Sequence, residues 1–99
     1  MHMNYSEMIN SNPVVLVEFY ASWCPHCKRM MPVVEQVKEL LAGKVNVYQF
    51  DIDENEELSD REGVKTIPTF IIYRDGKEQW RQSGEMDGQV LLNKVEQYL

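Results

Sequence analysis

The spacing of apolar residues changes along the chain, and each spacing predicts one kind of element. Residues 14–20 form an almost unbroken apolar run with β-branched and aromatic side chains, which is typical of a strand covered on both faces. From residue 24 to about 41 the apolar positions recur at helical spacing instead. Pro25 suits the first turn of this helix, Pro32 lies deeper within it, and Gly43 is placed to end it. A strand followed by a long helix is therefore expected here.

Shorter elements flank this pair. A short helix is expected over residues 5–10, with Asn4 or Ser6 as its cap. Residues 45–52 predict a second strand, and the acidic stretch at 51–62 predicts a loop and a short solvated helix.

The last third of the chain carries a hairpin signal. Two strand-like runs, residues 69–73 and 78–83, flank a turn that contains Asp75-Gly76, and Asp-Gly between such runs is a strong hairpin signal. A last helix is expected to start near Asp87, which is a good cap residue. Its inner face is expected to consist of Val90, Leu91, Val95 and Tyr98.

This order of elements predicts an α/β fold. The chain has 99 residues, of which 43% are hydrophobic, so one compact domain over residues 1–99 is expected. The unit of strand, long helix and strand predicts parallel pairing with a right-handed crossover, and the hairpin adds antiparallel strands. We therefore expect a central mixed sheet of about four strands with helices on both faces.

The charge balance narrows the range of partners. The formal net charge is −6, and ten basic residues are scattered among sixteen acidic ones, which argues against nucleic acid and anionic membrane as partners. Residues 1–11 carry no signal-peptide pattern, and the run at 13–21 is too short to span a bilayer and contains Glu18. We expect a cytoplasmic protein, or a periplasmic one if Met1-His2-Met3 is a cloning remnant that replaces an export signal.

The two cysteines, Cys24 and Cys27, lie at the expected junction between strand and helix. A disulfide between them closes too small a loop to stabilise the fold much, and a stapled secreted scaffold carries more cysteines at wider spacing. A structural zinc site needs four ligands, yet the sequence has no second cysteine pair, and His26 and His2 are poorly placed to supply them. No metal and no cofactor are therefore expected, and redox chemistry is the favoured interpretation.

Redox chemistry needs a thiolate, and the position of Cys24 favours one. Its sulfur is expected to face unpaired N–H groups and the positive end of the helix dipole, while His26 offers an N–H group or a positive charge to the same region. We expect a Cys24 pKa between roughly 4 and 7. Cys27 lies one helical turn further and is expected to be deeper and less ionised. Cys24 then attacks a substrate disulfide, and Cys27 resolves the mixed disulfide.

On these residues the sequence resembles the thioredoxin family over about residues 5–99. The matching stretches are Val17-Glu18-Phe19-Tyr20-Ala21-Ser22-Trp23-Cys24, Ile67-Pro68-Thr69, Asp75-Gly76, Gly84 and, within the long helix, Pro32. The resemblance implies the thioredoxin fold, a cis peptide bond between Ile67 and Pro68 that faces the sulfurs, and a shallow apolar groove for an extended substrate. The residues that it assigns to this groove are Trp23, Pro25, Ile67, Pro68 and Gly84.

Four features depart from the family pattern. Pro25-His26 stands where thioredoxins usually carry Gly-Pro and resembles the DsbA oxidases, although the chain has no room for their helical insertion. The family's buried aspartate is matched by Glu18, whose pKa is expected to be raised and which would accept the Cys27 proton. An ordinary satisfied polar residue is the alternative for Glu18. Its usual lysine partner is Gln49 here, and the family's first strand is missing, which leaves one sheet edge exposed.

The expected activity is the reduction of protein disulfides by a monomer, with electrons from a partner such as thioredoxin reductase. Because His26 favours the thiolate and so the reduced form, we expect a reduction potential of roughly −240 to −180 mV, above that of thioredoxin. The alternatives are a DsbA-like or isomerase-like oxidase in an exported compartment and a redox-inert binding module. Glu85, beside Gly84, either disfavours acidic substrates or is a solvated surface residue.

Overall fold

The computed structural model describes residues 3–99, so His2, which the sequence analysis excludes as a zinc ligand, lies outside the described residues. Within this range the helices and strands follow one another in the predicted order. They are α1 (Tyr5–Ile9), β1 (Val14–Tyr20), α2 (Pro25–Leu40), β2 (Asn46–Asp51), α3 (Glu56–Arg61), β3 (Thr69–Arg74), β4 (Lys77–Ser83) and α4 (Gly88–Glu96). None of the helices in residues 3–99 has the length and apolar character that crossing a membrane requires.

The four strands form one mixed sheet in the order β2-β1-β3-β4. β1 runs parallel to β2, with Glu18 opposite Gln49, and antiparallel to β3. β3 and β4 form the predicted hairpin, and its turn contains Asp75 at φ 52° and Gly76 at φ 79°, which is the left-handed backbone that such a turn requires. The expected mixed sheet is confirmed, and β2 lies at one edge of it.

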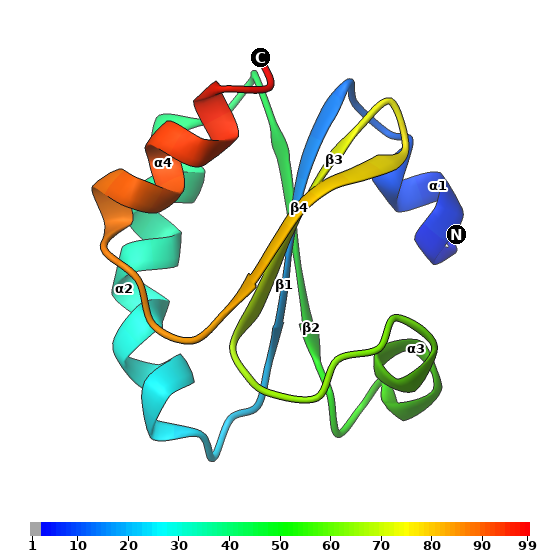
Figure 1. The fold of residues 1–99 in the computed structure, drawn as a ribbon, viewed down its shortest axis with the longest axis vertical. Helices are drawn as coiled ribbons and strands as arrows, with labels where there is room; N and C mark the ends of the chain where they lie inside the picture. The colour runs from blue at the N-terminus through cyan, green and yellow to red at the C-terminus, as the bar shows by residue number, and fades with distance from the viewer. Residues whose placement is uncertain (1–2) are drawn as a thin grey trace.

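Helices cover both faces of the sheet, as Figure 1 shows, with α2 and α4 on one face and α1 and α3 on the other. Successive side chains of β1 point to opposite faces, so this strand supplies two cores. Val14 and Leu16 pack in the core that includes residues of α2 and α4, whereas Val15 and Val17 pack in the core beneath α1 and α3. Burial on both faces explains why the apolar run of β1 is almost unbroken.

One residue of the expected inner face of α4 is exposed. Leu91 and Val95 are fully buried, but Val90 is 52% exposed. Successive residues of a helix are turned by about 100° from one another, so the stripe that buries Leu91 directs Val90 toward solvent. The prediction for Val90 was therefore wrong.

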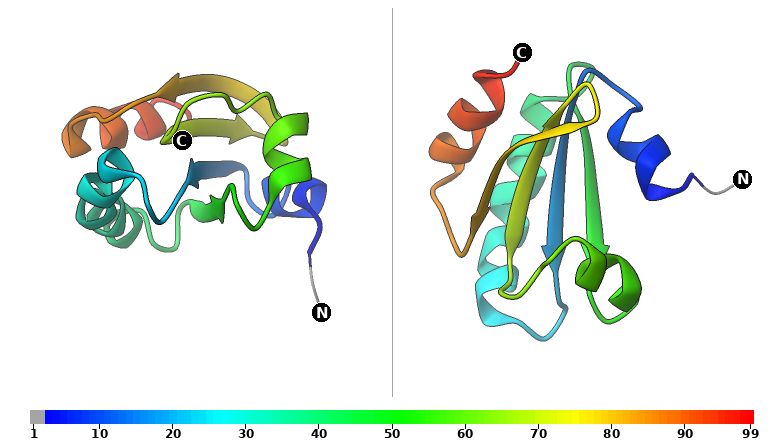
Figure 2. Two further views of the ribbon diagram at one scale, coloured as in Figure 1. Left: turned by 90° about the horizontal axis from the view of Figure 1, so that it is seen from below. Right: turned by 45° about the vertical axis from the view of Figure 1, so that its right-hand side comes forward.

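One end of the sheet collects the segments that form the site. β1 ends and α2 begins there, and β3 starts there because Phe19 pairs with Thr69. β4 ends at the same place, since Ser83 also pairs with Thr69. The C-terminus lies at the opposite end of the molecule (Figure 1 and the right-hand view of Figure 2).

Candidate active site

Cys24 caps the N-terminus of α2 with its own sulfur. Its backbone is extended, at φ −81° and ψ 118°, and its Sγ accepts a hydrogen bond from the N–H of Cys27 over 3.4 Å. Pro25, which has no N–H, occupies the first turn as predicted. Both thiols are free, and the two cysteines are buried, at 4% and 2% exposed. The sulfur of Cys24 thus faces the unpaired N–H groups with which a helix begins.

This position lowers the pKa of Cys24. Burial opposes the thiolate, but hydrogen bonds from the Cys27 side chain and from the backbone N–H groups of Cys27 and His26 favour it, as does the positive charge of Arg29. Together they hold the pKa of Cys24 below its ordinary value, which is the predicted direction. Sequence reasoning missed Arg29 as the side chain that supplies the positive charge.

Cys27 has the opposite environment. Burial and the hydrogen bond with Cys24 raise the pKa of the Cys27 thiol to about 12, although a hydrogen bond from the Ala21 backbone acts in the other direction. At neutral pH the first thiol therefore ionises far more readily than the second. This asymmetry is the one expected of a nucleophile and a resolving thiol.

Glu18 lies on β1 and is 3% exposed. Burial raises its pKa to about 7, while a hydrogen bond from Gln49 Nε2 to its Oε1, over 2.9 Å, acts in the other direction. The raised pKa agrees with the prediction from sequence. The carboxyl group therefore changes its protonation near neutral pH.

A cavity of 160 Å³ joins this carboxyl group to the buried thiol. Its lining residues are Glu18, Tyr20, Cys27, Met31, Glu35 and Gln49. At about 30 Å³ per water molecule, this volume has room for water that hydrogen-bonds to both groups. Glu18 and Cys27 thus line the same cavity.

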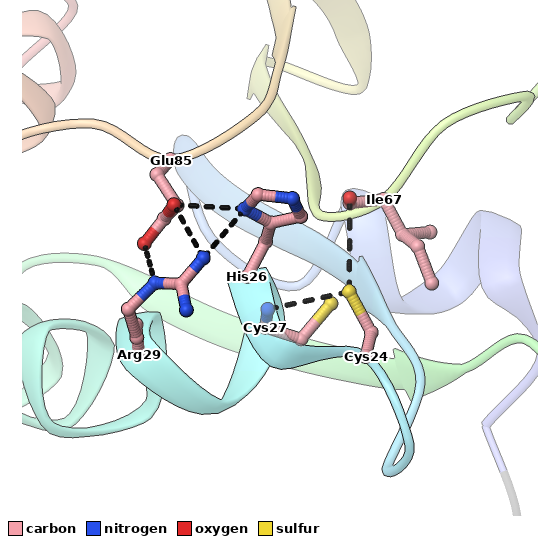
Figure 3. Close-up of polar contacts among 6 residues, drawn as sticks. All are labelled: Cys24, His26, Cys27, Arg29, Ile67 and Glu85. Carbon is pink, nitrogen blue, oxygen red and sulfur yellow. Dashed lines mark hydrogen bonds and ion pairs between the residues drawn. The ribbon is translucent and has the colours of Figure 1, made fainter.

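The loops around Cys24 bring together the residues that the sequence assigns to a groove. The Ile67–Pro68 peptide bond is cis, and the Ile67 carbonyl oxygen lies 3.9 Å from Cys24 Sγ (Figure 3). Gly84 donates its N–H to the Pro68 carbonyl over 2.8 Å. Its φ of +98° suits glycine, and no atom lies within 4 Å of the place where a Cβ would stand.

Trp23 lies immediately before Cys24 and is 61% exposed. Its Nε1 donates a hydrogen bond to Asp53 Oδ2 over 2.7 Å, which fixes the ring in an exposed position beside the site. Pro25 is also exposed. The contact with Asp53, a residue of the acidic stretch, depends on the tertiary structure and was not predicted.

The His26 ring contacts charged side chains instead of the sulfurs. Its Nδ1 lies 2.8 Å from Glu85 Oε2 and 2.9 Å from Arg29 Nη2 (Figure 3). Arg29 Nε donates to Glu85 Oε1 over 2.6 Å, and its Nη2 donates to Oε2 over 3.1 Å. The backbone N–H of His26 helps to lower the pKa of Cys24, in agreement with the predicted effect of the helix N-terminus. The imidazole ring, which was expected to act on the same sulfur, contacts Glu85 and Arg29.

A thiol pair at the start of a helix, beside a cis-proline loop on a four-stranded mixed sheet, defines the class of thioredoxin-fold dithiol proteins. The family model described as Thioredoxin matches residues 1–97. The chain belongs to the thioredoxin family.

Individual relatives agree with this assignment. A thioredoxin of Rickettsia felis is 33% identical over 89 residues, which are 90% of this chain and 85% of that protein. Chloroplastic thioredoxin Y1 of Arabidopsis thaliana is 32% identical over 92 residues, which are 93% of this chain but 54% of that protein. The chain thus spans about half the length of this chloroplastic relative. A solved mutant thioredoxin from Halobacterium salinarum superposes with a TM-score of 0.88 at 33% identity, covering 99% of this chain and 85% of that one.

Proposed function

We propose that this chain is a protein-disulfide reductase in which Cys24 is the nucleophile and Cys27 the resolving thiol. The observation that carries the proposal is the Cys24 sulfur at the start of α2. This sulfur accepts a hydrogen bond from the Cys27 N–H, which favours its thiolate form. It also lies beside the backbone carbonyl of Ile67, where a substrate segment is proposed to bind.

In the first step the Cys24 thiolate attacks one sulfur of a substrate disulfide. A bond forms between that sulfur and Cys24, and the other substrate sulfur leaves as a thiolate that takes a proton from solvent. Only the thiolate is nucleophilic, so the lowered pKa of Cys24 increases the reactive fraction at neutral pH.

In the second step Cys27 resolves the mixed disulfide. Its thiol, with a pKa of about 12, must first give up a proton, and the carboxylate of Glu18 accepts it across the shared cavity. The Cys27 thiolate then attacks the Cys24 sulfur and closes the Cys24–Cys27 disulfide. The second substrate sulfur leaves as a thiolate, so two electrons have passed from the dithiol to the substrate.

The groove orients the substrate for the first step. The backbone at Ile67 pairs with an extended substrate segment as an added strand does, next to the Cys24 sulfur. A side chain at Gly84 would stand in open space, so glycine leaves that space free, and the exposed Trp23 and Pro25 provide apolar contacts at the rim.

The partners follow from this chemistry. The substrates are protein disulfides, and the oxidised Cys24–Cys27 pair is returned to the dithiol by a reductase of the thioredoxin reductase type. A reducing compartment such as the cytoplasm suits a site that must be kept reduced. One chain carries both thiols and the groove, so a monomer is sufficient for the reaction.

The main alternative is a thiol oxidase or isomerase, which the Pro25-His26 dipeptide favours. The reduction potential measured against glutathione separates the two. A value near about −270 mV supports the reductase, and a value well above about −200 mV supports the oxidase and an exported compartment.

Insulin reduction by dithiothreitol is the direct test. We expect the protein to accelerate the reaction and Cys24→Ser to abolish the acceleration. When reduced Cys27→Ser is mixed with insulin without dithiothreitol, it is expected to form a mixed disulfide that persists on a non-reducing gel. Acceleration that survives Cys24→Ser contradicts the assigned nucleophile. No rate above that of dithiothreitol alone supports the third possibility, a redox-inert binding module.

A further inference from the structure

Glu85 joins the two basic side chains of the first turns of α2 to the loop between β4 and α4. Its two carboxylate oxygens contact Arg29 through two hydrogen bonds and His26 through one, as Figure 3 shows. Glu85 is separated in the sequence by 59 residues from His26 and by 56 residues from Arg29. The arrangement of the three side chains therefore depends on the fold, and the charge of Arg29 within it acts on Cys24.

The geometry defines which group donates at His26 Nδ1. Arg29 offers only donors, and the ionised carboxylate of Glu85 offers only acceptors. Because Nδ1 lies 2.8 Å from the carboxylate, it carries a hydrogen and donates it to Glu85 Oε2. A protonated Nδ1 cannot accept a hydrogen bond from Arg29 Nη2. Within this cluster Nη2 therefore donates to the Glu85 carboxylate alone. Glu85 thus holds both side chains by itself.

The charges in this cluster act on Cys24. Arg29 is a positive charge that favours the Cys24 thiolate, and the Cys24 thiolate in turn favours the charged form of Arg29. The hydrogen bonds from Arg29 and His26 lower the pKa of Glu85 to about 2, so its carboxylate is ionised at neutral pH. The negative carboxylate of Glu85 is therefore bound to Arg29, the cation that stabilises the Cys24 thiolate. Beyond these groups, Cys27 and, behind it, Glu18 are the titratable neighbours of the site.

We propose that Glu85 acts as a counter-ion that limits how strongly Arg29 stabilises the Cys24 thiolate. Stabilising the thiolate stabilises the reduced protein and makes the disulfide more oxidising. The carboxylate is therefore expected to make the site more reducing than Arg29 without a counter-ion would make it. This inference rests on the proposed reductase function, because it concerns the same dithiol.

The test compares three variants with the wild-type protein. Glu85→Gln removes the negative charge and keeps the shape, and Arg29→Met removes the positive charge. Glu39→Gln makes the same charge change on the exposed surface at the other end of α2. At 1.5 Å per residue, Glu39 lies about 20 Å along the helix from Cys24, beyond the screening length of about 10 Å at 0.1 M salt.

Two measurements are made on each variant. The ultraviolet absorbance of the thiolate against pH reports the Cys24 pKa, and equilibration with glutathione reports the reduction potential. For Glu85→Gln we expect a lower Cys24 pKa and a disulfide-forming equilibrium constant smaller by about two- to fivefold, the range that exposed ion pairs support. For this two-electron couple the change is a rise of about 10 to 20 mV. Arg29→Met is expected to shift both quantities the opposite way, and Glu39→Gln to leave them at the wild-type values.

Salt gives an independent readout that a purely structural role would not move. The three side chains are partly exposed, at 59%, 58% and 36% for His26, Arg29 and Glu85, so the Glu85→Gln shift is expected to shrink as ionic strength rises. An unchanged potential in Glu85→Gln, or a fall, overturns the inference, since a fall means that Glu85 chiefly serves to hold Arg29 near the sulfur. Failure of the reductase proposal has different signatures, both in the wild-type protein, namely no insulin turnover or a reduction potential well above about −200 mV.

Discussion

Glu18 carries a carboxyl group on a strand whose other buried side chains are apolar. Among residues 3–99 its side chain accepts one hydrogen bond, from Gln49. A neutral amide compensates the buried carboxyl group less than a cation would. The carboxyl group is consequently protonated for part of the time at neutral pH, when its pKa is about 7. This is the condition in which it both takes up and gives back a proton during turnover.

Replacing Glu18 is expected to change the pH dependence of stability. The pKa of 4.5 in the unfolded chain rises to about 7 in the fold, so the folded protein binds more protons between these pH values. Stability therefore falls as pH rises from about 4.5 to 7, and Glu18→Gln removes this loss. At pH 8 the variant is expected to be more stable on the order of 3 kcal/mol, which is the 1.36 kcal/mol per pKa unit applied to this shift.

Urea denaturation between pH 4 and pH 8 measures this effect, with Cys24 and Cys27 both changed to Ser so that no thiol titrates. Glu35→Gln, an exposed glutamate that lines the same cavity, is the control for the change of charge. Parallel stability curves for Glu18→Gln and its parent would show that the carboxyl group is not buried in the way described. In the active protein, Glu18→Gln is also expected to slow the resolution step more than the first attack.

At the scale of single residues, the structure agrees with the predicted pKa directions of Cys24 and Glu18 and with the cis bond before Pro68. The contacts of Glu85 with Arg29 and His26 were missed. Cys24 and Cys27 are recognisable because local helix geometry alone brings i and i+3 together. Arg29 shares a helix face with His26 for the same reason, so local geometry could have indicated it. The contact of Glu85 with α2 could not be predicted, because it depends on where the loop after β4 ends in three dimensions.

At the scale of elements, α2 and α4 cover the same face of the sheet but have different roles. α2 presents its first turn to the site, and α4 packs beside α2 in the core that contains Leu91 and Val95. The packing of α4 contributes to the position of the loop that carries Glu85, because this loop ends where α4 begins. Loss of α4 packing is therefore expected to affect stability first.

Leu91→Ala is expected to destabilise the protein by about 2–5 kcal/mol, the range for removing a fully buried leucine side chain. Val90→Ala, one residue away on the exposed face of α4, is expected to change stability by less than about 0.5 kcal/mol. Thermal or urea unfolding of both variants measures the difference. Equal losses for Leu91→Ala and Val90→Ala would mean that α4 packs through a different face.

The elements themselves were well predicted from periodicity and turn residues. β1 and β3 read as strands because both faces are buried, and the Asp75-Gly76 turn follows from its positive φ values. Val90 was misassigned because a short helix with apolar residues on adjacent positions offers two possible stripes. The sequence does not show which stripe faces the sheet, since that depends on the neighbouring helix.

At the scale of the whole molecule, the net charge of −6 acts on any substrate that approaches. A negatively charged protein attracts cationic partners over distances comparable with the screening length, and salt weakens this attraction. We therefore expect substrate recognition to have a long-range component that does not depend on the proposed groove.

Two disulfide-linked peptides that differ only in flanking lysines or glutamates test this component. The lysine peptide is expected to be reduced several-fold faster at low salt, with the two rates converging as ionic strength approaches roughly 0.5 M. Stopped-flow measurement of the first thiol–disulfide exchange gives both rates. Faster reduction of the glutamate peptide at low salt would assign control to the local Arg29 and His26 charges instead.

The positions of the dithiol and the C-terminus at opposite ends of the molecule also have a practical consequence. The dithiol lies where β1 meets α2, and the chain ends at the opposite pole (Figure 1). A tether added after Leu99 can anchor the protein to a bead or an electrode with the reactive end facing the solution. Immobilised in this orientation, every molecule presents the same surface, so disulfide-containing proteins could be captured from a flowing sample by a Cys27→Ser variant and released with dithiothreitol.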